Sequence, residues 1–552
     1  MRNIPKPNAM QLQYHRDELA AFMHFGMNTF TDSEWGDGTE DPASFNPSAF
    51  EADKMVSALQ EAGFKRLIVT AKHHDGFCIW PSLYTEHTVA SSPYDGDILA
   101  ELSAACTKYG LDMGLYLSPW DVHEPSYGYG DGHDEATDTN GDYNEYYINQ
   151  IREISGNPIY GREGRFVEWW LDGAKGTGSM AQEYDFPAWI AAIRENNPDI
   201  LIFGAGSEGG VHWVGNESGW APDANWCLLP DTGRFGTGED QVADDSANYL
   251  WSIPEVDVSI NAGWFWHEGQ EPKSPQKLAS IYFDSVGRGS PLLLNIPPNR
   301  DGDYPDAYYE AIARFGANIR NSFRHNVADR FAVTKISEDV DSGYYVYRVL
   351  FQAPVQFDCF ELKEAIDEHG QLVDRVAVRY VDRNGDLQRF QEAGTIGARR
   401  LLRGPQITTD ELLVTLHSIA GEPTITTVGA YLLTDDFKPQ ADSSSTVLRF
   451  AETSYRVKAG ESVEIRILRD DTSEAFEFYL DTPPGTAVSG QYYVDITHEA
   501  RRFEIGEAEL RFTVQTHPAD IGDGKAFFAQ LSHPAANGQT AISQCSIEII
   551  AD

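Results

Sequence analysis

The segment Leu67-Ile68-Val69-Thr70-Ala71-Lys72-His73-His74-Asp75-Gly76-Phe77 joins a short apolar run to a polar turn with two adjacent histidines. A short apolar run that contains β-branched residues is typical of a buried strand. Helical patterns lie on either side of it, at 50–63 and 98–109. Helix and strand in strict alternation indicate a parallel sheet with crossover helices, so this part of the chain is predicted to be α/β.

The same alternation continues over the first 320 or so residues. Apolar runs recur at 21–26, 113–117, 166–171, 200–203 and 292–295, and helical patterns near 144–155, 186–195, 275–286 and 304–323. About eight such repeats predict a closed (β/α)8 barrel over residues 1–330. The sixth repeat is the one whose pattern is unclear.

From about Phe331 the helical patterns give way to period-2 segments such as Tyr344-Tyr345-Val346-Tyr347-Arg348-Val349-Leu350. This spacing predicts an antiparallel β-sandwich at 331–438. A polar, serine-rich linker follows at 438–445, and a second β-sandwich is predicted at 446–552. The expected fold class is an α/β barrel followed by two antiparallel β-sandwich domains.

The composition excludes several classes of protein. The 552 residues carry 42 Lys and Arg against 85 Asp and Glu, a formal net charge of −43, so nucleic acid and anionic membranes are poor partners. With 41% hydrophobic and 12% aromatic residues, the chain is not a disordered acidic one. The five cysteines are scattered and indicate reduced thiols.

The N-terminal residues Met1-Arg2-Asn3-Ile4-Pro5-Lys6-Pro7 are polar and no apolar leader follows them. We therefore expect a cytoplasmic, bacterial protein, although a chain from which a signal peptide had been removed would look the same. The sequence does not determine the oligomeric state.

In a barrel, functional residues collect at the carboxyl ends of the strands. The residues found there are His24, the pair His73-His74, Tyr116, and the segment Trp170-Leu171-Asp172-Gly173. Aromatic faces, imidazoles and a few carboxylates suit a neutral polyhydroxylated ligand. Each histidine could equally be structural. Because the chain has no H-E-x-x-H motif and no third ligand at a characteristic spacing, no metal and no cofactor are predicted.

Three carboxylates are candidates for chemistry. Asp172 ends a run that would be a buried strand, where a carboxylate is costly unless it is paired or functional. Glu208 and Glu217 follow later strand ends. Glu217 lies in a Gly/Asn/Ser loop in which an idle, exposed glutamate would be ordinary, so spacing alone leaves its role open.

Three other motifs are interpreted as chance. Residues 204–209 fit G-x-G-x-x-G, but no helix start follows, as a dinucleotide site requires. The sequon Asn216-Glu217-Ser218 matters only in a secreted eukaryotic chain. The acidic stretch 134–142 has its glycine in the wrong place for an EF-hand.

At the candidate positions the sequence resembles the α-L-fucosidases of glycoside hydrolase family 29. The likeness covers roughly residues 10–320. It runs through Phe22-Met23-His24-Phe25-Gly26, Glu34-Trp35-Gly36, Ala71-Lys72-His73-His74-Asp75-Gly76-Phe77, Gly114-Leu115-Tyr116-Leu117-Ser118-Pro119-Trp120, Trp170-Leu171-Asp172-Gly173 and Leu294-Asn295-Ile296-Pro297-Pro298. The family's barrel is often irregular at its fifth and sixth helices and is followed by a β-sandwich.

This resemblance implies a retaining exo-hydrolase that removes terminal α-L-fucose. It places the nucleophile on Asp172 and the acid/base on Glu217, with Glu208 in reserve. Neighbours such as Trp213 and Trp220, or the charge of Asp172, could raise the pKa of Glu217. The implied fucose-binding residues are His24, Glu34, Trp35, His73, His74, Tyr116, Trp170 and Trp264.

The segment Gly215-Asn216-Glu217-Ser218-Gly219-Trp220 is similar to that of the subgroup acting on branched α-1,3/1,4-linked fucose, as in Lewis a, Lewis x and 3-fucosyllactose. The partner expected is therefore a fucosylated oligosaccharide, its galactose held by loops around 120–145 and 213–240. A broad-specificity fucosidase and a non-catalytic fucose-binding protein on the same fold are the alternatives.

The last unit loosely resembles a Calx-β sandwich, through residues 484–493 and 503–507. Some members of that group bind Ca²⁺ through clustered carboxylates. No such cluster is apparent in this sequence, so an inert spacer or a packing domain is the expected role.

Overall fold

The computed structural model divides the chain into two compact units, Met1–Lys438 and Pro439–Asp552. The first unit is described at residues 4–127, 142–174, 182–231, 248–328, 331–340 and 342–438. The second is described at 448–452, 454–469, 476–482, 487–496, 499–504, 506–519, 525–532, 540–542 and 544–550.

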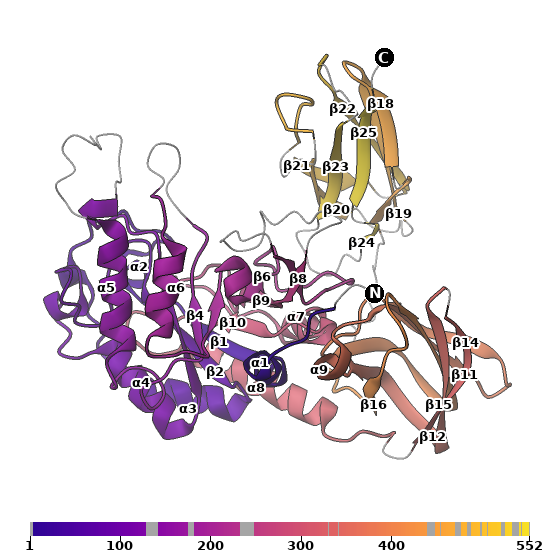
Figure 1. The fold of residues 1–552 in the computed structure, drawn as a ribbon, viewed down its shortest axis with the longest axis horizontal. Coiled ribbons are helices and arrows are strands. Elements are labelled where there is room, and N and C mark those ends of the chain that lie inside the picture. Colours follow the sequence, from indigo (N-terminus) through magenta and orange to yellow (C-terminus); the bar gives the residue numbers. More distant parts are fainter. Residues whose placement is uncertain are drawn as a thin grey trace. The chain divides into compact units, whose positions relative to one another are not determined.

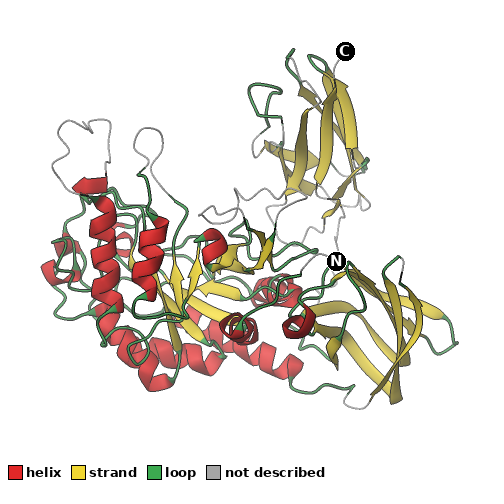
Figure 2. Ribbon diagram, in the orientation of Figure 1, coloured by secondary structure: helices red, strands yellow, loops and turns green. Residues whose placement is uncertain are grey.

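The first unit contains a closed barrel in which all neighbouring strands are parallel (Figures 1 and 2). The strands follow one another in the order β1-β10-β9-β6-β5-β4-β3-β2. Their bounds are β1 (Leu19–Met23), β2 (Arg66–Lys72), β3 (Asp112–Leu117), β4 (Glu168–Trp170), β5 (Leu201–Phe203), β6 (Gly210–Trp213), β9 (Ile253–Ser259) and β10 (Leu292–Asn295). The predicted fold class of the barrel is confirmed.

Helices cover the outside of the barrel (Figure 2). They are α3 (Ala52–Ala62), α4 (Ile98–Tyr109), α5 (Tyr143–Ser155), α6 (Phe186–Arg194), α7 (Pro275–Asp284) and α8 (Asp306–Phe323), and the short α2 (Met27–Thr31) follows β1. Local sequence fixes their ends. In α4, the side chain of Asp97 accepts from the backbone N–H of Ala100, and Gly110 ends the helix in the left-handed conformation.

The barrel is irregular after β5 and β6. A single 3-10 turn, η5 (Gly206–Glu208), joins these two strands. Between β6 and β9, the described residues contain the two-stranded ribbon of β7 (Leu228–Pro230) and β8 (Tyr249–Trp251), and residues 232–247 lie outside the description. The sixth repeat lacked a clear pattern because β6 follows β5 almost at once, without a crossover helix.

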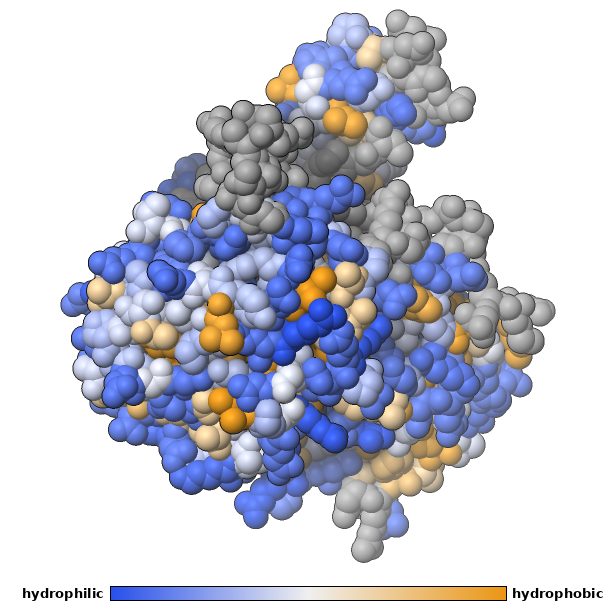
Figure 3. Space-filling model, turned by 60° about the vertical axis from the view of Figure 1, so that its left-hand side comes forward, coloured by the Kyte–Doolittle hydropathy of each residue, from blue (hydrophilic) through white to orange (hydrophobic). Residues whose placement is uncertain are grey.

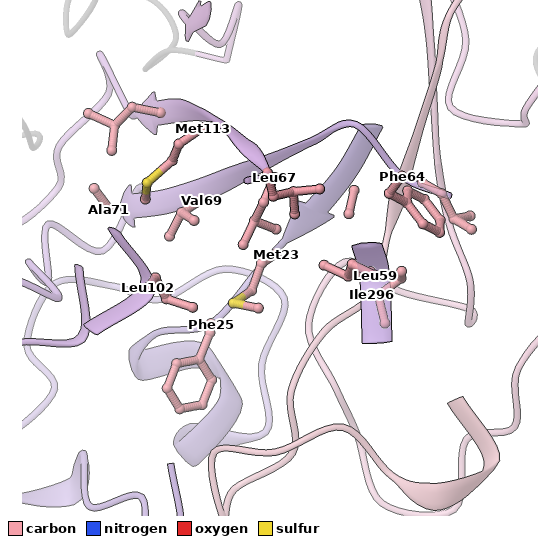
Figure 4. Close-up of a cluster of buried hydrophobic side chains, with 14 of the residues drawn as sticks. Met23, Phe25, Leu59, Phe64, Leu67, Val69, Ala71, Leu102, Met113 and Ile296 are labelled. Atoms are coloured by element: carbon pink, nitrogen blue, oxygen red, sulfur yellow. The ribbon is translucent and has the colours of Figure 1, made fainter. Parts of the chain in front are cut away.

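Apolar side chains fill the space between strands and helices (Figure 4). Met23, Val69 and Met113 come from three adjacent strands and are fully buried. Leu59 of α3 and Leu102 of α4 are buried in the same cluster. Burial of each such side chain contributes about 1.5–3 kcal/mol to folding.

Helix α1 (Ala9–Asp17) contributes to a polar cluster inside the barrel. The hydroxyl of Tyr14 contacts both carboxylate oxygens of Glu168 at 3.0 Å and also donates to Glu255. The Arg66 guanidinium pairs with Glu168 and lies 3.6 Å from the centre of the Tyr14 ring. Burial raises the pKa of Glu168 to about 7 and that of Glu255 well above its usual range.

The strands β11 to β16, here called the middle β domain, form a six-stranded antiparallel sheet around their own core. It contacts the barrel through Arg399, which donates to Glu18 at 2.6 Å and to Tyr282 at 2.8 Å. The bounds are β11 (Phe331–Asp339), β12 (Tyr344–Glu364), β13 (Val373–Val381), β14 (Leu387–Ala393), β15 (Arg400–Ser418) and β16 (Ile425–Tyr431), with α9 (Ile366–His369) between β12 and β13.

The second unit consists of a four-stranded and a five-stranded sheet around a shared apolar core. Its strands are β17 (Leu448–Phe450), β18 (Ser454–Lys458), β19 (Ser462–Arg469), β20 (Phe476–Asp481), β21 (Glu499–Phe503), β22 (Glu509–Gln515), β23 (Lys525–Ser532), β24 (Thr540–Ile542) and β25 (Gln544–Ile550). The predicted succession of an α/β barrel and antiparallel sheets is therefore confirmed.

The face shown in Figure 3 is mostly hydrophilic, with small, separate hydrophobic patches. Within the described residues, none of the helices combines the length and the apolar character that a membrane crossing needs.

Candidate active site

A cavity of about 630 Å³ lies at the carboxyl ends of the barrel strands. Its walls include both Asp172 and Glu217. They also include every predicted ligand-binding residue: His24, Glu34, Trp35, His73, His74, Tyr116, Trp170 and Trp264. The structure thus brings together residues that the sequence separates by up to 240 positions, because parallel strands all end at one rim.

Asp172 follows β4 by two residues and is 26% exposed. Its Oδ2 accepts a hydrogen bond from the Tyr116 hydroxyl at 2.7 Å, and its Oδ1 accepts one from the backbone N–H of Ala174 at 2.8 Å. The Nε2 of His74 lies 3.8 Å from Oδ2. The carboxylate is therefore held in one orientation and still reaches the cavity.

Glu217 lies in the loop after β6, and its Oε2 accepts from the indole N–H of Trp264 at 3.3 Å. Burial raises the pKa of Glu217, the negative charges of Asp172 and Glu34 raise it further, and the Trp264 hydrogen bond opposes them. Of the two tryptophans expected to raise the pKa of Glu217, Trp213 lines the cavity, whereas Trp220 is 41% exposed and lies outside the lining, so the contribution of Trp220 stays a prediction.

The three histidines of the cavity are buried, and burial lowers the pKa of each, which favours the neutral imidazole. The Nδ1 of His24 donates to Asn295 Oδ1 at 2.9 Å, and burial lowers the pKa of His24 to about 3. Burial likewise lowers the pKa of His74 and holds that of His73 well below its usual range. Neutral imidazoles exchange hydrogen bonds with hydroxyl groups without adding charge to the cavity.

Glu34 links the loop after β1 to the loop after β9. Its Oε2 accepts from the backbone N–H of Trp264 at 2.8 Å, and its Oε1 contacts His267 Nε2 at 2.6 Å. A Cβ atom on Gly263 would lie 2.0 Å from Glu34 Oε1, so a larger residue at this position would displace the Glu34 carboxylate. Trp35 is 60% exposed and meets the ring of His74 edge-on.

Trp170 is fixed at the bottom of the cavity. Its ring stacks on Phe203 with centroids 3.7 Å apart, and its indole N–H donates to Glu255 Oε1 at 2.9 Å. Phe203 also lines the cavity, and no sequence argument had selected it. Phe203 could have been selected because it ends the apolar run 200–203 and therefore lies at the carboxyl end of a strand.

Two further ionisable residues of the cavity were missed. Asp257 on β9 is 2% exposed and accepts from the Trp213 indole at 2.9 Å, and burial together with the charge of Glu217 raises its pKa to about 8. Lys273 donates to the carbonyls of Ser259 and Asn261 at 2.6 Å, and burial lowers its pKa to about 8.

Glu208 is not brought into this cavity. It lies on η5, its side chain is 58% exposed, and its carboxylate is 3.5 Å from Arg194. The G-x-G-x-x-G segment leads into this turn and then into strand β6, so the dismissal of a dinucleotide site is supported.

Several expectations lie partly outside the described residues. The acidic stretch 134–142 is described only at Asp142, and the loops expected to hold galactose lack 128–141 and 232–247. Within the described part of the chain, no group of three His, Cys, Asp or Glu side chains could hold a metal ion. All five cysteines are free and buried.

Comparisons with known proteins agree with this geometry. The family model for α-L-fucosidases matches residues 7–322. The chain is 35% identical to α-L-fucosidase 1 of Arabidopsis thaliana over 465 residues, which cover 78% of this chain and 88% of the plant protein.

Solved structures show the same relationship. A Ruminococcus gnavus family 29 fucosidase in complex with fucose is 38% identical, with a TM-score of 0.71 over 79% of this chain and 97% of that one. A family 29 member from an unknown rumen bacterium is 28% identical, with a TM-score of 0.71 over 99% of this chain and 100% of that one. The chain therefore belongs to the α-L-fucosidases of glycoside hydrolase family 29.

Proposed function

We propose that this α-L-fucosidase is a retaining exo-enzyme that releases terminal α-1,3/1,4-linked L-fucose from branched oligosaccharides of the Lewis a, Lewis x and 3-fucosyllactose type. Asp172 is the nucleophile and Glu217 is the acid/base. The observation that carries this proposal is that the two carboxyls share one cavity but differ in environment. Asp172 accepts two hydrogen bonds, whereas burial raises the pKa of Glu217.

In the first step, a carboxylate oxygen of Asp172 attacks the anomeric carbon of fucose. The glycosidic C–O bond breaks as Glu217 transfers its proton to the departing oxygen. The products are a fucosyl ester on Asp172 and a Glu217 carboxylate, so charge and protons balance.

In the second step, water attacks the anomeric carbon of the ester, and Glu217 takes the proton from that water. Asp172 leaves as a carboxylate and fucose is released with its original configuration. While the ester exists, the charge of Asp172 is absent, which removes one of the causes that raise the pKa of Glu217. Glu217 is thus suited to release its proton in the first step and to act as a base in the second.

The neutral imidazoles of His24, His73 and His74 would bond the sugar hydroxyls. The stacked rings of Trp170 and Phe203 offer an apolar wall for the C6 methyl group. The fucose complex of the Ruminococcus gnavus relative supports fucose as the ligand of this cavity.

The branched-substrate preference rests on the resemblance of the Glu217 loop and is the finer part of the proposal. The test is the product profile on 3-fucosyllactose, Lewis a and Lewis x trisaccharides and 2′-fucosyllactose, with NMR recording the anomer released first. We expect hydrolysis of the first three, little of the last, and α-L-fucose as the initial product. Rapid, unselective turnover of 4-nitrophenyl fucoside would instead indicate the broad-specificity alternative.

Variants assign the two carboxyls. We expect Asp172→Asn to abolish turnover, and Glu217→Ala to be rescued by azide with formation of α-L-fucosyl azide. Rescue of Glu208→Ala but not of Glu217→Ala would move the acid/base role to the reserve residue. Absence of turnover in the parent protein, with fucose still bound, would leave only the non-catalytic alternative.

We also propose that the second unit is a Calx-β-like packing domain. Its two sheets around one core are compatible with that resemblance. Addition or removal of Ca²⁺ should leave its unfolding temperature unchanged, and a Ca²⁺-dependent shift would contradict the packing role.

A further inference from the structure

We infer that the middle β domain positions the general acid, and that Thr395 and Gln371 are the positioning residues. This inference rests on the proposed role of Glu217. The relevant segment is residues 214–227, here called the acid/base loop, which leads from β6 to β7 and carries Glu217. It contains Gly215, Gly219 and other small polar residues, so its own sequence favours no single conformation.

The barrel holds the beginning and middle of the acid/base loop. The backbone N–H of Val214 donates to the Glu255 carbonyl at 3.1 Å. Further along, the N–H of Ala221 donates to the Asp284 carbonyl at 2.8 Å, and Arg288 donates to the Ala221 carbonyl at 2.5 Å. These contacts anchor the loop on β9 and on the end of α7.

The other end is held from both sides. The barrel binds it through the Asn225 side-chain amide, which donates to the Arg288 carbonyl and to the Ser290 hydroxyl at 2.9 Å, and the middle β domain binds its backbone. The Thr395 hydroxyl donates to the Asn225 carbonyl at 2.7 Å and accepts from the Asn225 N–H at 2.9 Å. The Gln371 amide donates to the same carbonyl at 2.8 Å and accepts from the N–H of Cys227 at 2.9 Å. Both side chains are at most 1% exposed, so two residues of the domain satisfy three backbone groups of the loop away from water.

A third contact of the middle β domain lies closer to Glu217 along the sequence. The backbone N–H of Gly394 donates to Asp223 Oδ2 at 2.7 Å, and Arg400 forms an ion pair with the same carboxylate. A Cβ atom on Gly394 would lie 2.5 Å from the Asp223 carbonyl oxygen. The backbones of the domain and the loop therefore touch at this point.

These anchors matter because the Glu217 carboxyl itself is weakly held. Among the described residues, its one hydrogen bond is the 3.3 Å contact with Trp264. The position of the carboxyl therefore depends on the path of the loop. A general acid must lie within hydrogen-bond reach of the departing oxygen, and a misplacement of about 1 Å can cost about 100-fold in rate.

Not every contact of the domain with the barrel serves the loop. Arg314 on α8 pairs with Asp436 beyond β16, and this pair involves no residue of the acid/base loop. Arg314→Gln is accordingly the matched control, since it weakens the same domain interface elsewhere.

The test compares two substrates. The first substrate is 3-fucosyllactose, or 2′-fucosyllactose if the parent enzyme prefers it, and its leaving oxygen needs a proton. The second is α-L-fucosyl fluoride, whose fluoride departs with much less assistance from a general acid. We expect Thr395→Val to lower kcat/KM on the oligosaccharide about 10- to 100-fold and on the fluoride less than about 3-fold, because only positioning of the acid is disturbed. Thr395→Ser, which keeps the hydroxyl, should restore most of the activity.

Gln371→Glu keeps the acceptor for Cys227 but loses the donor to Asn225, and it replaces Thr395→Val if circular dichroism shows that the latter does not fold. Equal losses on both substrates, or behaviour like that of Arg314→Gln, would overturn the positioning role. Glu217→Ala is measured alongside. If Glu217→Ala loses no more kcat/KM on the oligosaccharide than on the fluoride, Glu217 is not the general acid and the proposed function is wrong. If Glu217→Ala shows the selective loss and Thr395→Val does not, only the positioning role is wrong.

Discussion

The hydroxyl of Tyr116 on β3 donates across 2.7 Å to Oδ2 of Asp172, which lies two residues beyond the neighbouring strand β4. Burial, followed by the charge of Asp172, holds the pKa of Tyr116 well above its usual range, so the phenol remains a donor. Asp172 therefore has a permanent hydrogen-bond donor beside it. That donor fixes the orientation of the carboxylate before any sugar enters the cavity.

Replacing Tyr116 with phenylalanine should lower kcat/KM about 10- to 100-fold, because a hydrogen bond to a charged group contributes about 1.5–3 kcal/mol. The loss should be similar for the oligosaccharide and for α-L-fucosyl fluoride, since in the proposed mechanism Asp172 attacks both. Tyr147→Phe is the control, as its hydroxyl donates to the Leu117 carbonyl and lies outside the cavity lining. Unchanged kinetics in Tyr116→Phe would show that the bond does not serve catalysis.

The alkaline limb of the pH profile should respond to Glu34. Burial, and then the charges of Asp172 and Glu34, raise the pKa of Glu217, so Glu34→Gln should lower that pKa. The alkaline limb of kcat/KM reports the acid in the free enzyme and should move to lower pH, whatever happens to the absolute rate. Asp32→Asn removes a carboxylate that contacts the same histidine, His267, and should leave the limb in place. A shift in both variants would point to His267 instead.

Much of the barrel could be predicted because its strands are short apolar runs between capped helices. Helix α4 has the bounds that the sequence indicates, since Asp97 and Gly110 mark its two ends. Strand β6 was missed because it has only four residues, which follow β5 after a single 3-10 turn and are too few to show a period of their own. Strand β9 alternates Glu255 and Asp257 with apolar residues. This pattern indicates a half-buried strand, whereas all seven residues of β9 are buried.

Some residues of the candidate site could be predicted from the sequence, and others could not. Asp172 and the paired histidines directly follow buried runs, where a polar residue needs a reason to be present. Glu208 and Glu217 could not be separated by spacing, because both follow strand ends in loops. Their distinction depends on tertiary structure, namely the path of residues 214–227 over α7 and the middle β domain.

Asp257 should make stability depend on pH. Its pKa rises from 3.8 in the unfolded chain to about 8 in the fold, mainly through burial. Below about pH 4 the carboxyl is protonated in both the folded and the unfolded chain. Between about pH 4 and pH 8 it ionises only in the unfolded chain, so the free energy of unfolding falls as the pH rises. Above about pH 8 it is ionised in both states, and the free energy of unfolding falls no further on its account. Asp257→Asn lacks this penalty and keeps an acceptor for Trp213. Its advantage in unfolding temperature over the parent should therefore grow from pH 4 to pH 8, and a constant difference would contradict the assignment.

The Arg399 contacts should be a main source of stability between the barrel and the middle β domain. Arg399 donates to Glu361 at 2.7 Å and to Glu18 at 2.6 Å, and Glu361 is 4% exposed. Arg399→Met removes the closest cation from the buried Glu361 carboxylate, which keeps the Tyr431 hydroxyl at 2.7 Å and Lys363 at 3.6 Å. The loss should therefore stay below the cost of a fully unpaired buried charge, about 3–5 kcal/mol. Hydrogen exchange should show faster opening of residues 1–438 with no change in 439–552. Adding Glu361→Gln to Arg399→Met should recover part of the loss, because it removes the buried charge that Arg399 no longer neutralises. If the double variant opens no more slowly than Arg399→Met alone, packing of the guanidinium rather than its charge supports the interface.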